Sequence, residues 1–300
     1  MVTFGLTKQA VAGVTYFLDT FGTNCTAAWS TRKLDSGITN SMRIRRTSDN
    51  AETDIGFTGD FDLDTSAIAT HCSGTTCTVT TLYDQSGNSR NITNTTSADQ
   101  PTIYQSGATE VTASGLSKAA LLFDNASDFL FRNDRSGVGA GNAPITFAVV
   151  VDSTGTGNDG IITLGEDDTL PALGANFTLN LAASDLVSFH RRNSISRDYT
   201  SGNNRSCISI VVTHPSGGDV SSVEYWENGI DQTESGTGGQ TGTWALPSTS
   251  NRTWIGVGHT LSSTNVWYQG HIAEVIIYNA DVGNTTAANI GDDQEDYFVT

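Results

Sequence analysis

Short segments rich in β-branched and aromatic residues recur along this chain, with clusters of Gly, Asn, Asp and Ser between them. This pattern predicts antiparallel strands joined by tight turns, as in a β-sandwich or barrel. In one segment, Ile208, Ile210 and Val212 fall on the opposite face from Ser209 and Val211, as expected of a strand. The segments predicted to be strands are 76–83, 119–124, 128–132, 145–152, 160–165, 176–182, 186–192, 206–214, 222–229, 252–259 and 271–279.

Helical periodicity is confined to the segment 285–298, which follows a suitable cap at Asn284. The segment 27–44 is compatible with a short helix or with a hairpin. Turns depend on glycine, since the chain holds 31 Gly but only 5 Pro. We therefore predict an all-β fold, with one jelly-roll β-sandwich over 23–300. The apolar segment 1–22 is predicted to be an N-terminal arm or docking segment.

The charge balance is strongly acidic, with 15 basic and 32 acidic residues and a net charge of −17. Such a surface repels phosphate backbones, which argues against nucleic-acid binding. Aspartate accounts for 24 of the acids and favours turns and caps, in keeping with a loop-rich protein. No apolar stretch is long enough for a membrane helix. The segment after Met1 lacks the basic start of a signal peptide, so we expect synthesis in a cytoplasm.

Four cysteines are present, and two of them lie close together. Cys72 and Cys77 close a short loop that suits a local disulfide. Zinc binding is the competing interpretation, but no second close pair of Cys or His lies nearby in sequence. We predict the disulfide. Cys25 and Cys207 are either free or paired with each other.

Asp60, Asp62 and Asp64 alternate along an extended segment and offer three carboxylates of the kind that calcium binds. An EF-hand is excluded, because Thr65 and His71 stand where that loop requires glycine and glutamate. The preferred interpretation is a solvated strand face. Calcium remains possible, and no other cofactor is predicted.

Several side chains have the chemistry that sugar binding or sugar hydrolysis uses. Aromatic rings stack on the apolar faces of sugars, which makes four aromatic residues candidate platforms: Trp226, Trp254, Trp267 and Tyr268. Each would instead belong to the core if its strand is half-buried. Glu224 and Glu227 flank one of these residues, and Glu166, Asp167 and Asp168 follow a predicted strand. The sequence holds no metal-binding histidine spacing, serine-hydrolase elbow, phosphate loop or dinucleotide fingerprint.

The stretch TTLYDQSGN, at 80–88, joins a strand to a polar turn. Asp84 can bond nearby backbone groups, and Gly87 can adopt a positive φ. We expect Asp84, Gln85 and Gly87 to be structural, with the side chains of Asp84 and Gln85 bonded to the backbone.

The spacing of Cys72 and Cys77, the following strand and the YDQSGN turn resemble the catalytic domain of family 54 α-L-arabinofuranosidases. The AAWSTR run at 27–32 resembles the start of that domain. The resemblance implies a concanavalin A-like jelly roll. It also implies a retaining glycosidase, with a glutamate nucleophile on a central strand and an aspartate acid/base after a glycine-rich strand end.

By approximate alignment, those two positions fall in NFTLN at 176–180 and in GVGHT at 256–260. Neither segment contains an acid, so we expect the active site of the family to be absent. If the chain is nevertheless an enzyme, Glu224, Glu227 and Asp167 are the first acids to test.

A second and longer resemblance, over most of 25–280, is to laminin-G-like domains of bacteriophage virion proteins. It is carried by the WSTRKL, RIRRTSDNAETDIGF, YDQSGN, LLFDNASDFL and YQGHIAEVIIYN runs. It implies a non-enzymatic virion protein, either a capsid decoration protein or a tail fibre or spike component. We predict this function, with assembly in the host cytoplasm.

The predicted partners are capsid or tail proteins and further copies of the chain, with a glycan as a possible ligand. Two alternatives stay open. One is an α-L-arabinofuranosidase-like glycoside hydrolase, and the other is a free carbohydrate-binding module.

Overall fold

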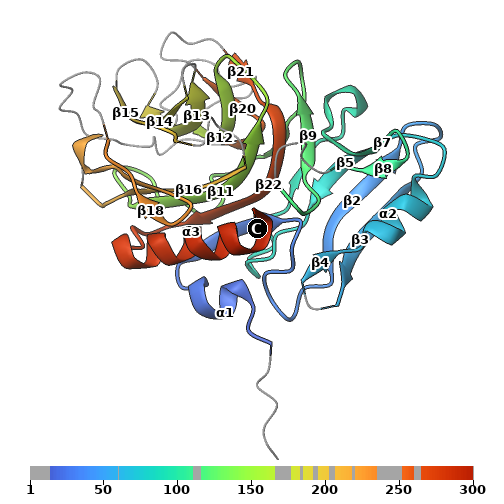
Figure 1. Ribbon diagram of the computed structural model, residues 1–300, viewed down its shortest axis with the longest axis horizontal. Helices are drawn as coiled ribbons and strands as arrows, with labels where there is room; N and C mark the ends of the chain where they lie inside the picture. Colours follow the sequence, from blue (N-terminus) through green and yellow to red (C-terminus); the bar gives the residue numbers. More distant parts are fainter. Residues whose placement is uncertain are drawn as a thin grey trace, which may run out of the picture.

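Strand β22, Gln269–Tyr278, lies at the centre of the fold in the computed structural model (Figure 1). One edge pairs antiparallel with β11, Ile145–Ser153. The other edge pairs with β9, Leu121–Asp124, and then with β1, Cys25–Ser30. All residues of β22 after the first are buried, because both of its faces are covered. The structure describes residues 14–59, 61–110, 116–165, 177–182, 185–191, 195–202, 207–217, 220–234, 252–259 and 265–299.

The other strands are short, as the frequent turn residues require. In the first half of the chain they are β2 (Asn40–Arg46), β3 (Glu52–Thr58), β4 (Asp62–Leu63), β5 (Cys77–Leu82), β6 (Ile92–Thr93), β7 (Thr102–Gln105), β8 (Ala108–Thr109) and β10 (Leu130–Arg132). In the second half they are β12 (Asp159–Gly165), β13 (Phe177–Ala182), β14 (Leu186–Arg191), β15 (Ile195–Thr200), β16 (Ile208–His214), β17 (Glu224–Glu227), β18 (Ile230–Asp231), β19 (Arg252–Ile255), β20 (Val257–His259) and β21 (Asn265–Trp267).

These strands form two layers around an apolar core. One layer runs β18–β17–β16–β11–β22, with β1 and β9 on the far edge of β22. The other layer runs β15–β14–β13–β12–β19–β10–β6–β5–β2–β3–β4. Strand β7 pairs with both β5 and β9 and so connects the layers. Strands β20 and β21 form a separate two-stranded ribbon.

The predicted β-sandwich is therefore confirmed, and every segment predicted to be a strand contains one. The open question over 27–44 is answered by β1 and β2, which are strands. The predicted alternation of faces in β16 is also confirmed, because Ile208, Ile210 and Val212 all pack in the core between the layers. Val211 faces the other way, toward a helix.

In the described part of the chain, three α-helices flank the sheets. The predicted C-terminal helix is α3, Asn284–Phe298, which packs on the outer side of β11, β16 and β17. Helix α1, Phe17–Phe21, lies against α3 inside the predicted arm, of which residues 1–13 are outside the described part. Helix α2, Thr65–His71, was missed because it holds only seven residues, too few to show a period. Within the described residues, no helix is long and apolar enough to cross a membrane.

A buried ion pair joins the segment after β1 to the central strand, and the same arginine also contacts α3. Arg32 donates to both carboxylate oxygens of Glu274, from Nε at 2.8 Å and from Nη2 at 3.0 Å. Glu274 also accepts from Ser30 Oγ at 2.6 Å and from Gln294 Nε2 at 3.0 Å. The third nitrogen of Arg32 reaches Asp293 on α3 at 2.6 Å. Each charge in this network thus has a partner, which a buried ion pair requires if it is not to destabilise the fold.

The YDQSGN turn is built as expected from its residue types. Asp84 accepts hydrogen bonds from the backbone amides of Ala28, Ser86 and Arg90 at 2.8–2.9 Å. Gly87 has a φ of +81°, in the region that favours glycine. Asp84 therefore fastens this turn to strand β1.

Gln85 performs a similar role for the chain that follows β1. Its side-chain oxygen accepts from the amide of Leu34 at 2.8 Å, and its amide group donates to the carbonyls of Ser30 and Arg32 at 3.0 Å each. Gln85 thereby orders the segment that carries Arg32.

The cysteines also follow the predicted pattern. Cys72 and Cys77 form a disulfide, which joins the end of α2 to the start of β5. No disulfide joins Cys25 to Cys207.

Replacing Asp84 by alanine should lower the free energy of unfolding by about 2–4 kcal/mol, because three amide donors lose a charged acceptor. Urea and thermal unfolding of the Asp84→Ala variant would measure the loss. Asp231→Ala is the matched control, because Asp231 is exposed at the edge of the sheet, and its stability should stay within about 0.5 kcal/mol of the parent. Equal stability of the two variants would contradict the structural role of Asp84.

Candidate functional site

The structure brings together the two strands on which the family resemblance places the catalytic acids. Strand β20 lies against β12 and β13, and Thr163 Oγ1 donates to the carbonyl of Val257 at 3.0 Å. The approach is close, since a Cβ added to Gly258 would lie 2.1 Å from Asn180 Oδ1 and 2.7 Å from Gly160 Cα. Glycine is therefore required at this crossing.

A row of polar side chains runs from β13 to β15 on the face that β20 covers. Asn180, Ser188 and Asp198 are direct cross-strand neighbours. Ser188 Oγ donates to Asp198 Oδ1 at 2.6 Å, and Ser196 Oγ donates to Asp198 Oδ2 at 3.1 Å. These four side chains are buried. The alternate residues of the same strands, such as Leu179, point into the core.

Aromatic residues continue this face on β10 and β19. Phe131 is paired with Trp254, and Trp254 with Thr163, so their side chains lie on the same side of the sheet. Phe131 stacks on Trp254 with ring centroids 5.2 Å apart, and the guanidinium of Arg252 lies 5.4 Å from the Phe131 ring. Phe129 bridges Trp254 and Trp267 on β21, at 5.3 and 6.1 Å.

We call this surface the outer face: the polar side chains of β12–β15 together with the aromatic cluster of Phe129, Phe131, Trp254 and Trp267. Aromatic rings on the same sheet face as hydroxyl, amide and carboxylate groups are a combination that suits sugars, because a sugar has apolar C–H faces and a rim of hydroxyls. The outer face is therefore the candidate functional site.

The four aromatic residues predicted as sugar platforms separate into two pairs. Trp254 and Trp267 belong to the outer face, although Trp254 is buried by its neighbours. Trp226 packs against α3, and Tyr268 packs in the core against Phe123. Trp226 and Tyr268 are thus core residues in this fold and present no ring face to a ligand.

The predicted acids lie away from the outer face or outside the described residues. Glu227 is buried on the core side of β17, near Tyr199, and its negative charge adds to burial in raising the pKa of that tyrosine. Glu224 is on the opposite side of the same strand, where burial and Glu234 raise its pKa. Glu166, Asp167 and Asp168 lie outside the described residues.

The described aspartates that were considered for calcium binding have different partners and do not share a site. Asp62 accepts from Lys118 Nζ and from Tyr297 OH, both at 2.8 Å, whereas Asp64 accepts from the amide of Ala67 and caps α2. Asp60 lies outside the described residues. Among the residues that the structure describes, no group of three or more His, Cys, Asp or Glu is arranged to hold a metal ion.

Sequence reasoning missed the polar row. Strand β15 was not predicted, so Asp198 had no strand on which to be placed. The available signal was alternation, since Thr178 and Asn180, Ser188 and His190, and Ser196 and Asp198 all occur at a spacing of two. What the sequence could not supply was the register that aligns the three pairs.

A family model described as "Alpha-L-arabinofuranosidase B, catalytic" matches residues 17–180, more than half of the chain. The chain belongs to this family. A probable α-L-arabinofuranosidase B of Aspergillus niger is 32% identical over 165 residues, which cover 51% of this chain and 33% of that protein. The α-L-arabinofuranosidase B of Aspergillus kawachii is 36% identical over 96 residues, covering 31% of this chain and 19% of that protein. The matches thus span a third or less of each relative.

Solved structures of arabinofuranosidases share the fold over nearly the whole chain. A mutant GH54 enzyme soaked with 4-nitrophenyl α-L-arabinofuranoside has a TM-score of 0.63 and 17% identity, and covers 92% of this chain and 63% of its own. An arabinofuranosidase complexed with arabinofuranosyl-α-1,2-xylobiose has a TM-score of 0.62 and 16% identity, and covers 95% and 66%. At such identities the likeness is evidence for the fold alone.

The prediction of a non-enzymatic phage virion protein is wrong, because the family model describes an enzyme's catalytic domain and the relatives are α-L-arabinofuranosidases. The predicted capsid or tail partners and the predicted virion location are therefore wrong as well. That prediction rested on the longer phage-type resemblance and on two short segments that contain no acid.

One acid close to the aromatic cluster has a shifted pKa. Burial raises the pKa of Asp128 from 3.8 to about 7, and the carboxylates of Asp124 and Asp99 add to the effect. Asp128 precedes Phe129, and its carbonyl lies beside Gly256, at the junction of β19 and β20.

The raised pKa of Asp128 predicts that stability falls with increasing pH. Because the folded state holds this proton more tightly than the unfolded state, the stabilisation is complete below pH 4 and is lost as the pH rises through about 7. Asp128→Asn should remove this loss, and should be more stable than the parent at pH 8 by on the order of 2 kcal/mol, with little difference at pH 4. Urea unfolding from pH 4 to pH 8, with Asp231→Asn in parallel, would measure it. A parallel pH dependence for Asp128→Asn and the parent would contradict the shift.

Proposed function

We propose that this chain is a glycoside hydrolase that releases α-L-arabinofuranosyl units from a glycan. The observation that carries the proposal is that the matched family segment ends on β13, one of the strands of the outer face. That face carries both polar side chains and aromatic rings, as sugar sites do. The relatives named as α-L-arabinofuranosidases support the substrate class.

Glycoside hydrolysis uses a pair of carboxyl groups, one as proton donor and the other as nucleophile or base. Asp198 is our candidate for the second role. It lies in the polar row two strands from Asn180, and two serine hydroxyls fix the orientation of its carboxylate. Fixed orientation is what a nucleophile or base needs in order to meet its substrate without reorganisation.

The proton donor requires a carboxyl group that is protonated near neutral pH. The raised pKa of Asp128 fits this requirement, but its position does not. Five strand steps, from β10 through β19, β12, β13 and β14 to β15, separate it from Asp198, whereas paired carboxyl groups lie within about 10 Å of each other. Glu166, Asp167 and Asp168 are the candidates by sequence, because they directly follow β12. Replacing each of these three acids by its amide, one at a time, would identify the donor as the variant whose activity on substrates with poor leaving groups falls most.

The parent protein should hydrolyse 4-nitrophenyl α-L-arabinofuranoside, with release of nitrophenol measured by absorbance. Asp198→Asn should lower kcat by about 100-fold or more with a smaller change in KM, because a reacting group is lost and the binding surface is retained. Asp231→Asn, an exposed aspartate on the opposite layer, is the matched control and should keep full activity.

Two outcomes separate the parts of this proposal. An inactive parent protein, folded by its thermal transition, would overturn the hydrolase function for this substrate. An active parent with an equally active Asp198→Asn variant would keep the function and reject the role of Asp198.

A further inference from the structure

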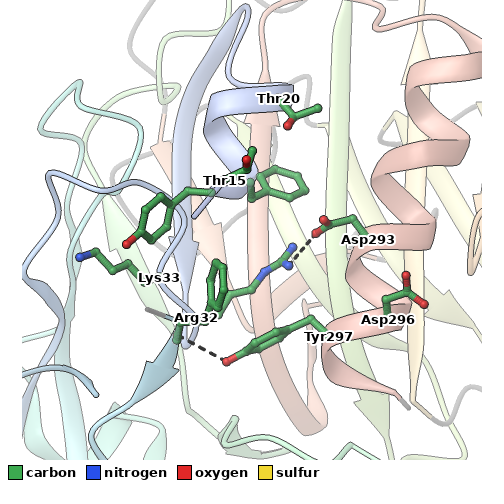
Figure 2. A pocket seen from close by; sticks show the side chains of 10 residues that line it. Thr15, Thr20, Arg32, Lys33, Asp293, Asp296 and Tyr297 are labelled. Atoms are coloured by element: carbon green, nitrogen blue, oxygen red, sulfur yellow. Dashed lines mark hydrogen bonds and ion pairs between the residues drawn. The ribbon is translucent and has the colours of Figure 1, made fainter. Parts of the chain in front are cut away.

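A cavity lies on the other side of the molecule from the outer face. It has a volume of about 380 Å³ and opens between α1, the segment after β1, the turn before β4 and the last turns of α3 (Figure 2). In Figure 1 the helices α1 and α3 lie below the sandwich, whereas β13–β15 and the β20–β21 ribbon lie at the top. None of the outer-face residues lines this cavity.

Aromatic rings form much of its wall. Tyr16, Phe17, Phe61 and Tyr297 all line it. Phe61 is 36% exposed, one of only three large hydrophobic side chains in the described residues with an exposed surface. Its ring lies 5.5 Å from that of Tyr16. Tyr297 is held in place by its hydroxyl, which donates to Asp62 at 2.8 Å. These rings form a preformed apolar wall.

Charged groups complete the cavity and balance one another. Lys33 lies on one side of it, and Asp293 and Asp296 project from α3 on the other, with Arg32 between them (Figure 2). Arg32 is already occupied by Glu274 and Asp293, and its guanidinium lies 4.8 Å from the centre of the Phe17 ring. Lys33 Nζ lies 5.3 Å from the centre of the Tyr16 ring.

This composition points to a neutral, hydroxylated ligand. An anion such as phosphate would meet the carboxylates of Asp293 and Asp296, and a cation would meet Lys33 and Arg32. A sugar has no charge, and its hydroxyls can donate to the carboxylates and accept from the ammonium group, while its C–H face covers a ring. The volume is within the range of small-ligand pockets.

From these observations we infer that the cavity is a second carbohydrate-binding site, which holds a neutral sugar unit of a polysaccharide away from the hydrolytic face. The inference rests on the proposed function only for the choice of polysaccharide. Binding a distant part of the polymer would raise the local concentration of substrate without any contact to the reacting bond.

Affinity electrophoresis in gels containing soluble arabinoxylan, and calorimetric titration with arabinofuranosyl-α-1,2-xylobiose, would test the site. Phe61→Ala removes the exposed ring, and Asp296→Asn changes an exposed hydrogen-bonding group with little effect on shape. Phe61→Ala should weaken binding to arabinoxylan about three- to tenfold, the range for loss of one ring contact. Asp296→Asn should also weaken binding to arabinoxylan.

Ile230→Ala is the matched control, since Ile230 is an exposed apolar residue at the sheet edge, outside the cavity. In the arabinoxylan gels, the Ile230→Ala variant should be retarded as much as the parent. For Phe61→Ala, kcat/KM on 4-nitrophenyl α-L-arabinofuranoside should be unchanged, while the rate on dilute arabinoxylan falls. Thermal unfolding would show that each variant is folded.

The outcomes separate this inference from the proposed function. Equal retardation of the parent, Phe61→Ala and Asp296→Asn, or no retardation of the parent, would overturn the second site whatever the hydrolytic activity. A parent that fails to hydrolyse the nitrophenyl arabinoside, but whose arabinoxylan binding depends on Phe61, would overturn the proposed function and support the second site.

Discussion

The buried pair of Arg32 and Glu274 is the interaction on which the arrangement of the elements depends. Glu274 lies in the central strand β22, and an unpaired charge at this depth would cost several kcal/mol. The segment after β1 must therefore bring Arg32 to it, and α3 must bring Gln294. The same arginine also donates to Asp293, so the buried carboxylate and the cavity between α1 and α3 share this side chain.

Gln85 explains how a polar turn distant in sequence supports this pair. Its side-chain nitrogen donates to the carbonyls of Ser30 and Arg32, and its side-chain oxygen accepts from the amide of Leu34, so Gln85 binds the chain on both sides of Arg32. Asp84 fastens the same turn to Ala28 on β1. Both side chains bond to backbone groups, so the turn indicates a fold and says little about chemistry. That is why the YDQSGN turn is compatible with two different functions.

Local patterns in the sequence predicted most of the fold. Alternation, turn residues and the Cys72–Cys77 spacing each depend on residues close in sequence, and the strands, the turn and the disulfide followed them. The candidate site depends on register between strands distant from one another. Trp254 could be identified as a candidate by its type, but its place beside Phe131 and Thr163 follows from pairings across β10, β19 and β12. Asp198 was missed for the same reason.

The distinction between local sequence pattern and strand register also applies to β13 and β20, neither of which contains an acid. Strand β20 still crosses β12 and β13 as closely as glycine allows, since a Cβ added to Gly258 would lie 2.7 Å from Gly160 Cα on β12 and 2.1 Å from Asn180 Oδ1 on β13. Neighbouring strands lie about 4.8 Å apart, which places the backbone of Asp198 roughly 10 Å from that of Asn180. Ser188 on β14 lies between these two residues, and its hydroxyl donates to Asp198 at 2.6 Å. Under the proposed function, the acting carboxylate would therefore stand on β15, two strands from the position on β13 that the resemblance indicates, and Ser188 would orient it.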